Sequence, residues 1–251
     1  MSFVSVSGVS KRFGTQIGVD DVSFELPQGD TAVIVGANGA GKTTLIRLLA
    51  SLARPTSGQI EIASEPLFDG DANVRSRIGL LSHETMLYDE LTARENLRLH
   101  ARLHGVDDAV CNDLLETVGL ADRGSERVGG FSHGMSKRVS LARVLVHDPD
   151  LLLFDEPYTG LDQTSLQRVA TVLEELEDRT VLAATHDLER GFDLADRFLF
   201  MNDGRLIGDI DANEFETADD LLTSYERFCR GGSAAPGNRL EDRQRLHGGS
   251  H

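Results

Sequence analysis

Hydrophobic and polar residues alternate in two stretches close to the N-terminus, residues 3–9 and 22–26. Alternation with a period of two predicts two β-strands, with residues 12–18 (RFGTQIG) as the turn between them. Residues 31–35 (TAVIV) form a short, β-branched apolar run, which is typical of a buried strand. The N-terminal part of the chain is therefore predicted to be rich in β-structure.

Helical patterns follow a glycine-rich stretch. Four leucines recur with the spacing of one helix face, in a predicted helix that Pro55 ends. These are Leu45, Leu48, Leu49 and Leu52. Residues 84–142 are predicted to be mostly helical, with Thr92 and Glu95 at the spacing of a capping box. Two glycines are predicted to end helices, Gly105 and Gly119.

Strands and helices alternate along the rest of the chain. Residues 150–157 (DLLLFDEP) predict a second buried strand, followed by a helix at about 163–178 and a strand at 180–186. A hairpin is predicted to turn at Asp203 and Gly204. Such alternation predicts an α/β fold with a mainly parallel sheet and helices on its faces.

The domain organisation follows from these elements and from a change in composition near the C-terminus. Residues 1–228 are predicted to form the folded domain, with a helical subdomain inserted at about 84–143. Residues 229–251 contain few apolar side chains and many glycines, arginines and polar residues. This segment is predicted to be a disordered tail.

The chain is strongly acidic. Its 41 aspartates and glutamates outnumber 25 lysines and arginines, which gives a net charge of −16. This charge repels nucleic acid and anionic lipid headgroups at long range, so no nucleic-acid partner is expected. A well-hydrated acidic surface is also typical of proteins adapted to high salt. The charge does not argue against nucleotide binding, because local backbone dipoles and one or two cations hold phosphates.

Cysteines and apolar segments exclude further classes of protein. Cys111 and Cys229 lie far apart, without a CxxC motif or a histidine cluster, so a structural zinc site is not expected. Both are expected to be reduced thiols. No signal core and no stretch of 18 apolar residues are present, so a membrane role is expected to come from a partner.

Residues 36–44 (GANGAGKTT) match the phosphate-loop motif G-x-x-x-x-G-K-[ST], directly after a predicted strand and at the start of a helix. The glycines let consecutive N–H groups point at phosphate oxygens, and the helix N-terminus adds its dipole. Lys42 is predicted to reach the β- and γ-phosphates, and the Thr43 hydroxyl to bind Mg²⁺. The alternative is an ordinary glycine turn. The predicted ATP-binding residues here are Gly36, Ala37, Asn38, Gly39, Ala40, Gly41, Lys42, Thr43 and Thr44.

Two carboxylates and a histidine follow later predicted strands. Asp155 is predicted to position Mg²⁺, and Glu156, which points the other way, to act as general base on the attacking water. The alternative is a solvated acidic pair that closes the strand. His186 closes the neighbouring predicted strand, at the sheet edge where α/β folds bind ligands, and is predicted to contact the γ-phosphate. The alternative is an ordinary surface or core histidine. The predicted catalytic residues are Glu156, His186 and Lys42.

Together with FSHGM (131–135) and GLD (160–162), these motifs resemble those of the ATP-binding subunits of ABC transporters, over residues 1–215. The resemblance implies a P-loop NTPase core with an N-terminal antiparallel β region. It implies ATP and Mg²⁺ as cofactors, and ATP hydrolysis coupled to transport. The implied partners are a transmembrane permease and a second ATP-binding subunit, identical or different. The implied location is peripheral, on the cytoplasmic face of the cell membrane.

In that family two subunits pack head to tail, and residues of one cover the nucleotide bound to the other. The resemblance implies this role in trans for Ser132, Gly134 and Asp162, with a helix from Ser136 that adds its dipole. His133 stands where the family usually has glycine. It either donates to a phosphate or ribose oxygen across the interface or makes no ligand contact.

Two further positions matter for the nucleotide. His83 stands where the family usually has a glutamine that senses Mg²⁺ and the attacking water. An imidazole nitrogen can accept a hydrogen bond from a metal-bound water. His83 therefore either contacts the nucleotide and the metal's ligand shell, or occupies this position without contacting them. Phe13 matches the aromatic residue that stacks on adenine. The alternative places Phe13 in the core between the first two strands.

The resemblance also suggests where the permease docks and what it carries. Met86, Leu87 and Tyr88 form an apolar cluster where the family receives a helix of the membrane subunit, unless they belong to the core. Residues 80–106 and 131–145 look like the haem exporter subunit of cytochrome c biogenesis. The alternative is a drug- or lipid-type exporter.

A different class, a soluble ABC ATPase acting on nucleic acid or ribosomes, typically has two cassettes, coiled coils or zinc modules, and none is found in the sequence.

Overall fold

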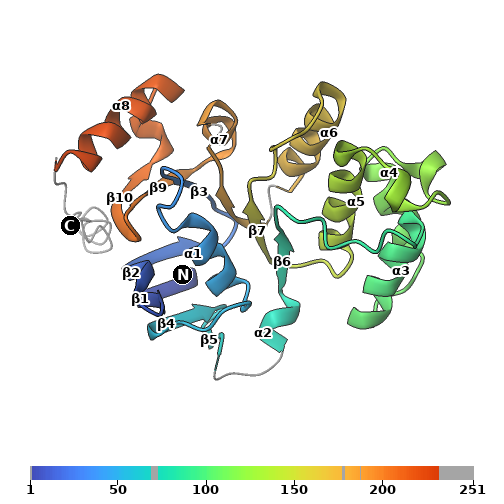
Figure 1. Cartoon of the computed structure of the whole chain (residues 1–251), viewed down its shortest axis with the longest axis horizontal. Helices are drawn as coiled ribbons and strands as arrows, with labels where there is room; N and C mark the ends of the chain where they lie inside the picture. Colours follow the sequence, from blue (N-terminus) through green and yellow to red (C-terminus); the bar gives the residue numbers. More distant parts are fainter. Residues whose placement is uncertain (1, 69–72, 177–178, 187, 232–251) are drawn as a thin grey trace, which may run out of the picture.

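Two β-sheets with surrounding helices make up the computed structural model, which describes residues 2–68, 73–176, 179–186 and 188–231 (Figure 1). Over these residues, the larger sheet has six strands in the order β10-β9-β3-β8-β7-β6. They are β3 (Thr31–Val35), β6 (Ile78–Leu81), β7 (Leu151–Asp155), β8 (Thr180–Ala184), β9 (Arg197–Asn202) and β10 (Arg205–Asp211). All neighbours are parallel except β9 and β10.

The smaller sheet is antiparallel, with the order β2-β1-β4-β5. Its strands are β1 (Ser2–Phe13), β2 (Gln16–Pro27), β4 (Ser57–Ile62) and β5 (Glu65–Pro66). The predicted turn over residues 12–18 is too long, because pairing continues to Phe13 and Gln16. The pattern also missed β4 and β6. Only two residues of β4 are fully buried, and β6 has only four residues, so neither gives a clear periodic signal.

Helices cover both faces of the larger sheet. They are α1 (Lys42–Leu49), α2 (Asn73–Ser76), α3 (Ala93–His104), α4 (Val110–Thr117), α5 (His133–Leu145), α6 (Gln163–Glu174), α7 (Leu188–Leu194) and α8 (Ala218–Cys229). Three short 3₁₀ turns are described, at Ala121–Arg123, Val128–Gly130 and Ala212–Glu214. Among the described helices, none combines the length and apolar composition that a membrane span requires.

The α1 helix packs in the core between the two sheets. Ala32 and Ile34 of β3 belong to the same apolar cluster as α1, whereas Val33 and Val35 belong to the cluster on the opposite face. Leu45, Leu48 and Leu49 are fully buried, as predicted. Leu52 is 60% exposed, which contradicts the prediction, because the helix ends at Leu49 and the helical spacing is lost beyond it.

The predicted helical subdomain is formed by α3, α4 and α5, which gather at the end of the molecule away from β1 and β2 (Figure 1). They share their own apolar core. Thr92 and Glu95 form the predicted capping box, with Glu95 N–H donating to Thr92 Oγ1 at 3.1 Å. Gly105 and Gly119 adopt φ of +70° and +68°, as expected for helix ends. Residues 84–91, however, precede the first helix rather than belong to it.

Several element ends differ from the predictions. The strand predicted at 180–186 ends at Ala184, and the helix predicted at 163–178 ends at Glu174, with residues 177–178 outside the described residues. The hairpin turns at Asp203 and Gly204, both with positive φ, as predicted. The tail is predicted to begin at residue 229, but Cys229 is still the last residue of α8. The part of the predicted tail from residue 232 onward lies outside the described residues.

Candidate nucleotide site

The carboxyl ends of four parallel strands lie side by side and bring four loops together. The order β3-β8-β7-β6 places the phosphate loop (residues 36–44, after β3) at the same edge as the loops after β8, β7 and β6, which carry His186, Glu156 and Ser82. The predicted adjacency of the His186 and Asp155 strands is thereby confirmed. This edge is where α/β folds of this kind bind ligands.

Two positions of the phosphate loop have room only for glycine, because neighbouring backbone lies too close for a side chain. A Cβ on Gly36 would lie 2.6 Å from the carbonyl oxygen of Met201, and one on Gly41 would lie 2.4 Å from that of Gly18. Gly41 also has φ of +103° and caps the N-terminus of α1. The loop therefore approaches neighbouring backbone closely and presents the start of α1, as phosphate binding requires.

Lys42 places its charge inside this loop. Its ammonium donates to the carbonyl oxygens of Gly36 (2.7 Å) and Ala37 (3.2 Å). Burial lowers the pKa of Lys42, while nearby Glu156 and Asp155 act in the opposite direction. A buried cation beside backbone N–H groups suits an anionic phosphate chain.

Thr43 and Asp155, each predicted to bind Mg²⁺, lie in contact with each other. The Thr43 hydroxyl donates to Asp155 Oδ1 at 3.0 Å, and the carboxylate is buried at the end of β7. Burial raises the pKa of Asp155, and the bond from Thr43 partly offsets this. A hydroxyl and a carboxylate are the hard oxygen ligands that Mg²⁺ prefers, so these residues fit the metal. His83, the third predicted metal ligand, is exposed on the loop after β6.

Glu156 and His186, each predicted to be catalytic, lie in contact with each other. His186 Nδ1 lies 2.7 Å from Glu156 Oε2, and the Thr159 hydroxyl donates to the same oxygen at 3.3 Å. The side chain of Glu156 is 20% exposed and that of His186 63% exposed. The carboxylate is therefore fixed in orientation while remaining open to a water molecule.

Ser132, Gly134 and Asp162, predicted to act in trans, cluster where α5 and α6 begin. Ser132 and Asp162 are the N-caps of these helices. A Cβ on Gly134 would lie 2.3 Å from Ser165 Oγ and 2.8 Å from Asp162 Oδ2. Hydrogen bonds from Ser165 lower the pKa of Asp162 and keep it ionised. The two helix starts therefore form one continuous surface.

His133 has a structural neighbour within its own subunit. A Cβ on Gly160, which has φ of +74°, would lie 3.1 Å from the His133 ring. The imidazole thus lies against the loop at 160–162, and whether it also contacts a nucleotide in trans stays a prediction. The α5 helix begins at His133, not at Ser136 as predicted, because Ser132 accepts a hydrogen bond from Met135 N–H as the N-cap.

Phe13 lies at the end of β1, beside the phosphate loop. Its ring is 54% exposed, so the alternative of burial between the first two strands is wrong. A Cβ on Gly18 would lie 3.0 Å from both Phe13 Cε2 and Thr44 Cγ2, which places the ring next to the C-terminal end of the loop. An exposed ring in this place is suited to stacking on a base.

We expect Phe13→Ala to weaken ATP binding, because stacking of a base on an aromatic ring contributes about 1–3 kcal/mol. The dissociation constant should rise about 5- to 150-fold. Titration with a fluorescent ATP analogue measures the change. Ile17→Ala, which removes another exposed apolar side chain at the start of β2, is the control and should bind normally. Equal affinities of wild type and Phe13→Ala would contradict the stacking role.

Sequence reasoning missed two residues that contact the site. Lys137 on α5 is buried and donates to backbone oxygens of Ser82 and Glu156. It has the helical spacing of the buried Leu141 and Val144, a signal that could have revealed it. Tyr225 on α8 accepts a hydrogen bond from Ala37 N–H at 3.1 Å, and its distance in sequence from the loop left no local signal.

The arrangement of strand, glycine-rich loop, lysine, threonine and strand-end carboxylates defines a P-loop nucleoside triphosphatase. The family model described as ABC transporter matches residues 19–159, and the chain belongs to this family as an ATP-binding subunit that hydrolyses ATP. It is 40% identical over 215 residues to the ABC transporter ATP-binding protein NatA of Bacillus subtilis, covering 81% of this chain and 87% of NatA.

Two further comparisons agree with this family. The chain is 36% identical over 213 residues to the bacitracin transport ATP-binding protein BcrA of Bacillus licheniformis, covering 83% of this chain and 70% of BcrA. A solved structure of the ATP-binding subunit of an ABC transporter superimposes with a TM-score of 0.81 at 27% identity. The match covers 90% of this chain and all of that one. The predicted fold class, with its antiparallel N-terminal sheet, is confirmed.

Proposed function

We propose that this ATPase powers export through a membrane permease, on the cytoplasmic face of the cell membrane, and that Glu156 is its general base. The observation that carries the proposal is the Glu156 carboxylate, held by His186 at 2.7 Å and open to solvent beside the phosphate loop. A carboxylate in this place can accept a proton from a water molecule that attacks a bound γ-phosphate.

The remaining residues bind and position. The N–H groups of the phosphate loop and the Lys42 ammonium hold the phosphates. Mg²⁺, when held by Thr43 and Asp155, would neutralise charge on the β- and γ-oxygens. His186 orients Glu156 and lies where it can contact the γ-phosphate, and His83 is free to approach the same region from its exposed loop.

The second subunit of the proposed dimer covers the nucleotide with Ser132, His133, Gly134 and Asp162. Two helix N-termini meet at this surface, and such termini attract anions. A homodimer would supply the surface twice, once for each nucleotide.

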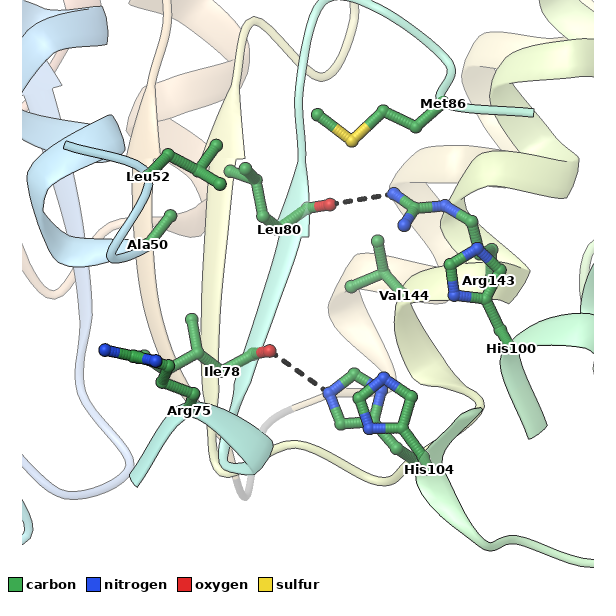
Figure 2. A pocket seen from close by; sticks show the side chains of 11 residues that line it. Ala50, Leu52, Arg75, Ile78, Leu80, Met86, His100, His104, Arg143 and Val144 are labelled. Carbon is green, nitrogen blue, oxygen red and sulfur yellow. Dashed lines mark hydrogen bonds between the residues drawn. The ribbon is translucent and has the colours of Figure 1, made fainter. Parts of the chain in front are cut away.

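A pocket of about 190 Å³ is our proposed docking site for the permease. It lies between the end of α1, β6 and the helical subdomain (Figure 2). It is lined by Ala50, Leu52, Arg75, Ile78, Leu80, Met86, His100, His104, Arg143, Val144 and His147. Met86 and Tyr88 are exposed, and Leu87 packs on the core of the subdomain, so the predicted cluster serves both surface and core.

The chemistry of the pocket suggests what docks there. Leu52 and Met86 offer exposed apolar surface on opposite sides of the pocket. Burial lowers the pKa of His100 to about 4, so its imidazole is neutral at pH 7, while Arg75 and Arg143 carry positive charge. Among the described lining residues, none bears a carboxylate. A permease segment with apolar and acidic side chains would fit this lining.

We expect Met86→Glu to reduce recovery of the permease at least tenfold, because a carboxylate replaces exposed apolar contact surface. Recovery is measured by affinity purification from gently solubilised membranes with equal amounts of tagged protein. Leu103→Glu is the matched control, since Leu103 is also exposed on the helical subdomain but does not line the pocket. Undiminished recovery with a folded Met86→Glu protein would argue against this docking site.

The second part of the proposal concerns the cargo, haem or a drug- or lipid-type molecule. The name of BcrA refers to bacitracin transport, which supports the drug- or lipid-type exporter, whereas haem export rests on the sequence resemblance alone. Tagged Glu156→Gln, expressed in the native cell with ATP present during purification, identifies the partners. A permease beside cytochrome c maturation proteins would favour haem, and a different permease would favour the alternative. Ribosomal or DNA-bound proteins without a permease would overturn the transporter proposal.

A further inference from the structure

Lys137 is a buried cation that contacts two loops of the nucleotide site, the loop after β6 and the loop after β7. It lies one turn into α5 and is 1% exposed. Its ammonium donates to the carbonyl oxygen of Ser82 at 2.8 Å and to that of Glu156 at 3.4 Å. Burying an ammonium costs free energy. An apolar side chain would fill this space without that cost, so the charge of Lys137 indicates a role beyond packing.

The Glu156 backbone needs such support. Its φ of +54° lies in the left-handed region, which costs free energy for a residue with a side chain. Its N–H donates to the carbonyl oxygen of Ala184 at 2.8 Å, which ties it to β8. Its own carbonyl oxygen faces the Lys137 ammonium. The backbone of the general base is therefore held from both sides.

The loop that carries His83 is held by the same helix. Lys137 bonds Ser82, the residue before His83, and the hydroxyl of Ser140 donates to the carbonyl oxygen of Thr85, two residues after it. The α5 helix begins at the surface proposed to cover the second subunit's nucleotide. Lys137 therefore connects that surface to both Glu156 and the His83 loop within one subunit.

Charge adds to this connection. Burial lowers the pKa of Lys137 to about 8, and Asp155 and Glu156 are the carboxylates that act against this effect. The Lys137 side chain therefore stays largely protonated at pH 7 and can donate both hydrogen bonds.

We propose that Lys137 is a positioning residue for ATP hydrolysis, which holds the Glu156 backbone and the His83 loop in one arrangement. The inference rests on the proposed role of Glu156. Lys137 lies outside the motifs that contact phosphate. Its loss should lower turnover directly and have little effect on ATP binding.

Steady-state ATP hydrolysis by Lys137→Met and Lys137→Gln tests the proposal. Lys137→Met removes both the hydrogen bonds and the charge, and should lower kcat about 10- to 100-fold with KM within about threefold of wild type. Lys137→Gln keeps a hydrogen-bond donor, so it should recover part of kcat at an unchanged KM.

Arg138→Met is the matched control. Arg138 is the next residue on α5 and also donates to two backbone oxygens, those of Val118 and Gly119. Its loss should cost stability but leave kcat unchanged. An equal loss of melting temperature in the Lys137 and Arg138 variants, with no difference between them in kcat, would make Lys137 merely structural and overturn the inference. Lys137→Gln decides the matter if Lys137→Met does not fold.

The test separates this inference from the proposed function. A Glu156→Gln protein with normal turnover would remove the base on which both depend. If Glu156→Gln is inactive but the Lys137 variants have normal kcat, only the role of Lys137 is overturned.

Discussion

Glu156→Gln is expected to lower ATP turnover by ~10²–10⁴-fold while ATP binding is retained. An amide has nearly the shape of the carboxylate but cannot accept a proton from the attacking water. Phosphate release under saturating ATP measures the loss, and nucleotide titration shows that the phosphate loop still binds. Bound but uncleaved ATP should also hold two subunits together, which size-exclusion chromatography with ATP detects.

A matched change elsewhere shows that the effect belongs to the site. Glu174→Gln alters an exposed glutamate at the end of α6, and its turnover should equal that of wild type. If Glu156→Gln retained near-normal turnover, Glu156 would not be the general base. The close pair with His186 would then have another role.

Asp155→Asn should abolish most hydrolysis and yet stabilise the protein without nucleotide. The loss of turnover is expected to reach ~10²–10³-fold, because an amide binds Mg²⁺ far more weakly than a carboxylate. The gain in stability follows from burial, which disfavours the ionised form of Asp155 in the folded state. The amide oxygen can still accept the hydrogen bond from the Thr43 hydroxyl.

The sign of the pH dependence provides a sharper test. The pKa of Asp155 is raised in the folded protein above its ordinary value of 3.8. The unfolded chain therefore releases this proton at lower pH than the folded protein, and wild-type stability falls as the pH rises from 3.8 through the raised pKa. The melting temperature of Asp155→Asn should exceed that of wild type at pH 7, and the difference should shrink toward about pH 4. A less stable variant at pH 7 would contradict this.

The nucleotide site could be predicted from sequence where its chemistry is local. The spacing of its glycines identifies the phosphate loop. Asp155, Glu156 and His186 each lie at or just after the end of an apolar strand. Parallel pairing then brings the strand ends to one edge, which makes such residues neighbours without any long-range information. The contacts of Thr43 with Asp155 and of Glu156 with His186 follow from this geometry.

The features that sequence reasoning missed depend on tertiary contacts. The sequence predicts that α5 begins at Ser136, three residues too late, because His133 and Gly134 are poor helix formers. Ser132 nevertheless offers a suitable N-cap. The α1 helix was predicted one turn too long, since Leu52 continues the apolar spacing beyond the residue where the backbone leaves the helix. Lys137 has a polar side chain in an apolar pattern, and only the fold shows which oxygens it reaches.

The contact between α8 and the phosphate loop sets a limit on shortening the chain. Tyr225 joins Ala37 N–H to the carbonyl oxygen of Met201, so it ties the loop to β9 across nearly the whole sequence. Phe228 also lies within 3.1 Å of the place where Gly208 would carry a Cβ. A truncation made to remove the C-terminal segment should therefore end after Cys229, because a cut before Thr217 would leave an N–H of the ATP-binding loop without its acceptor.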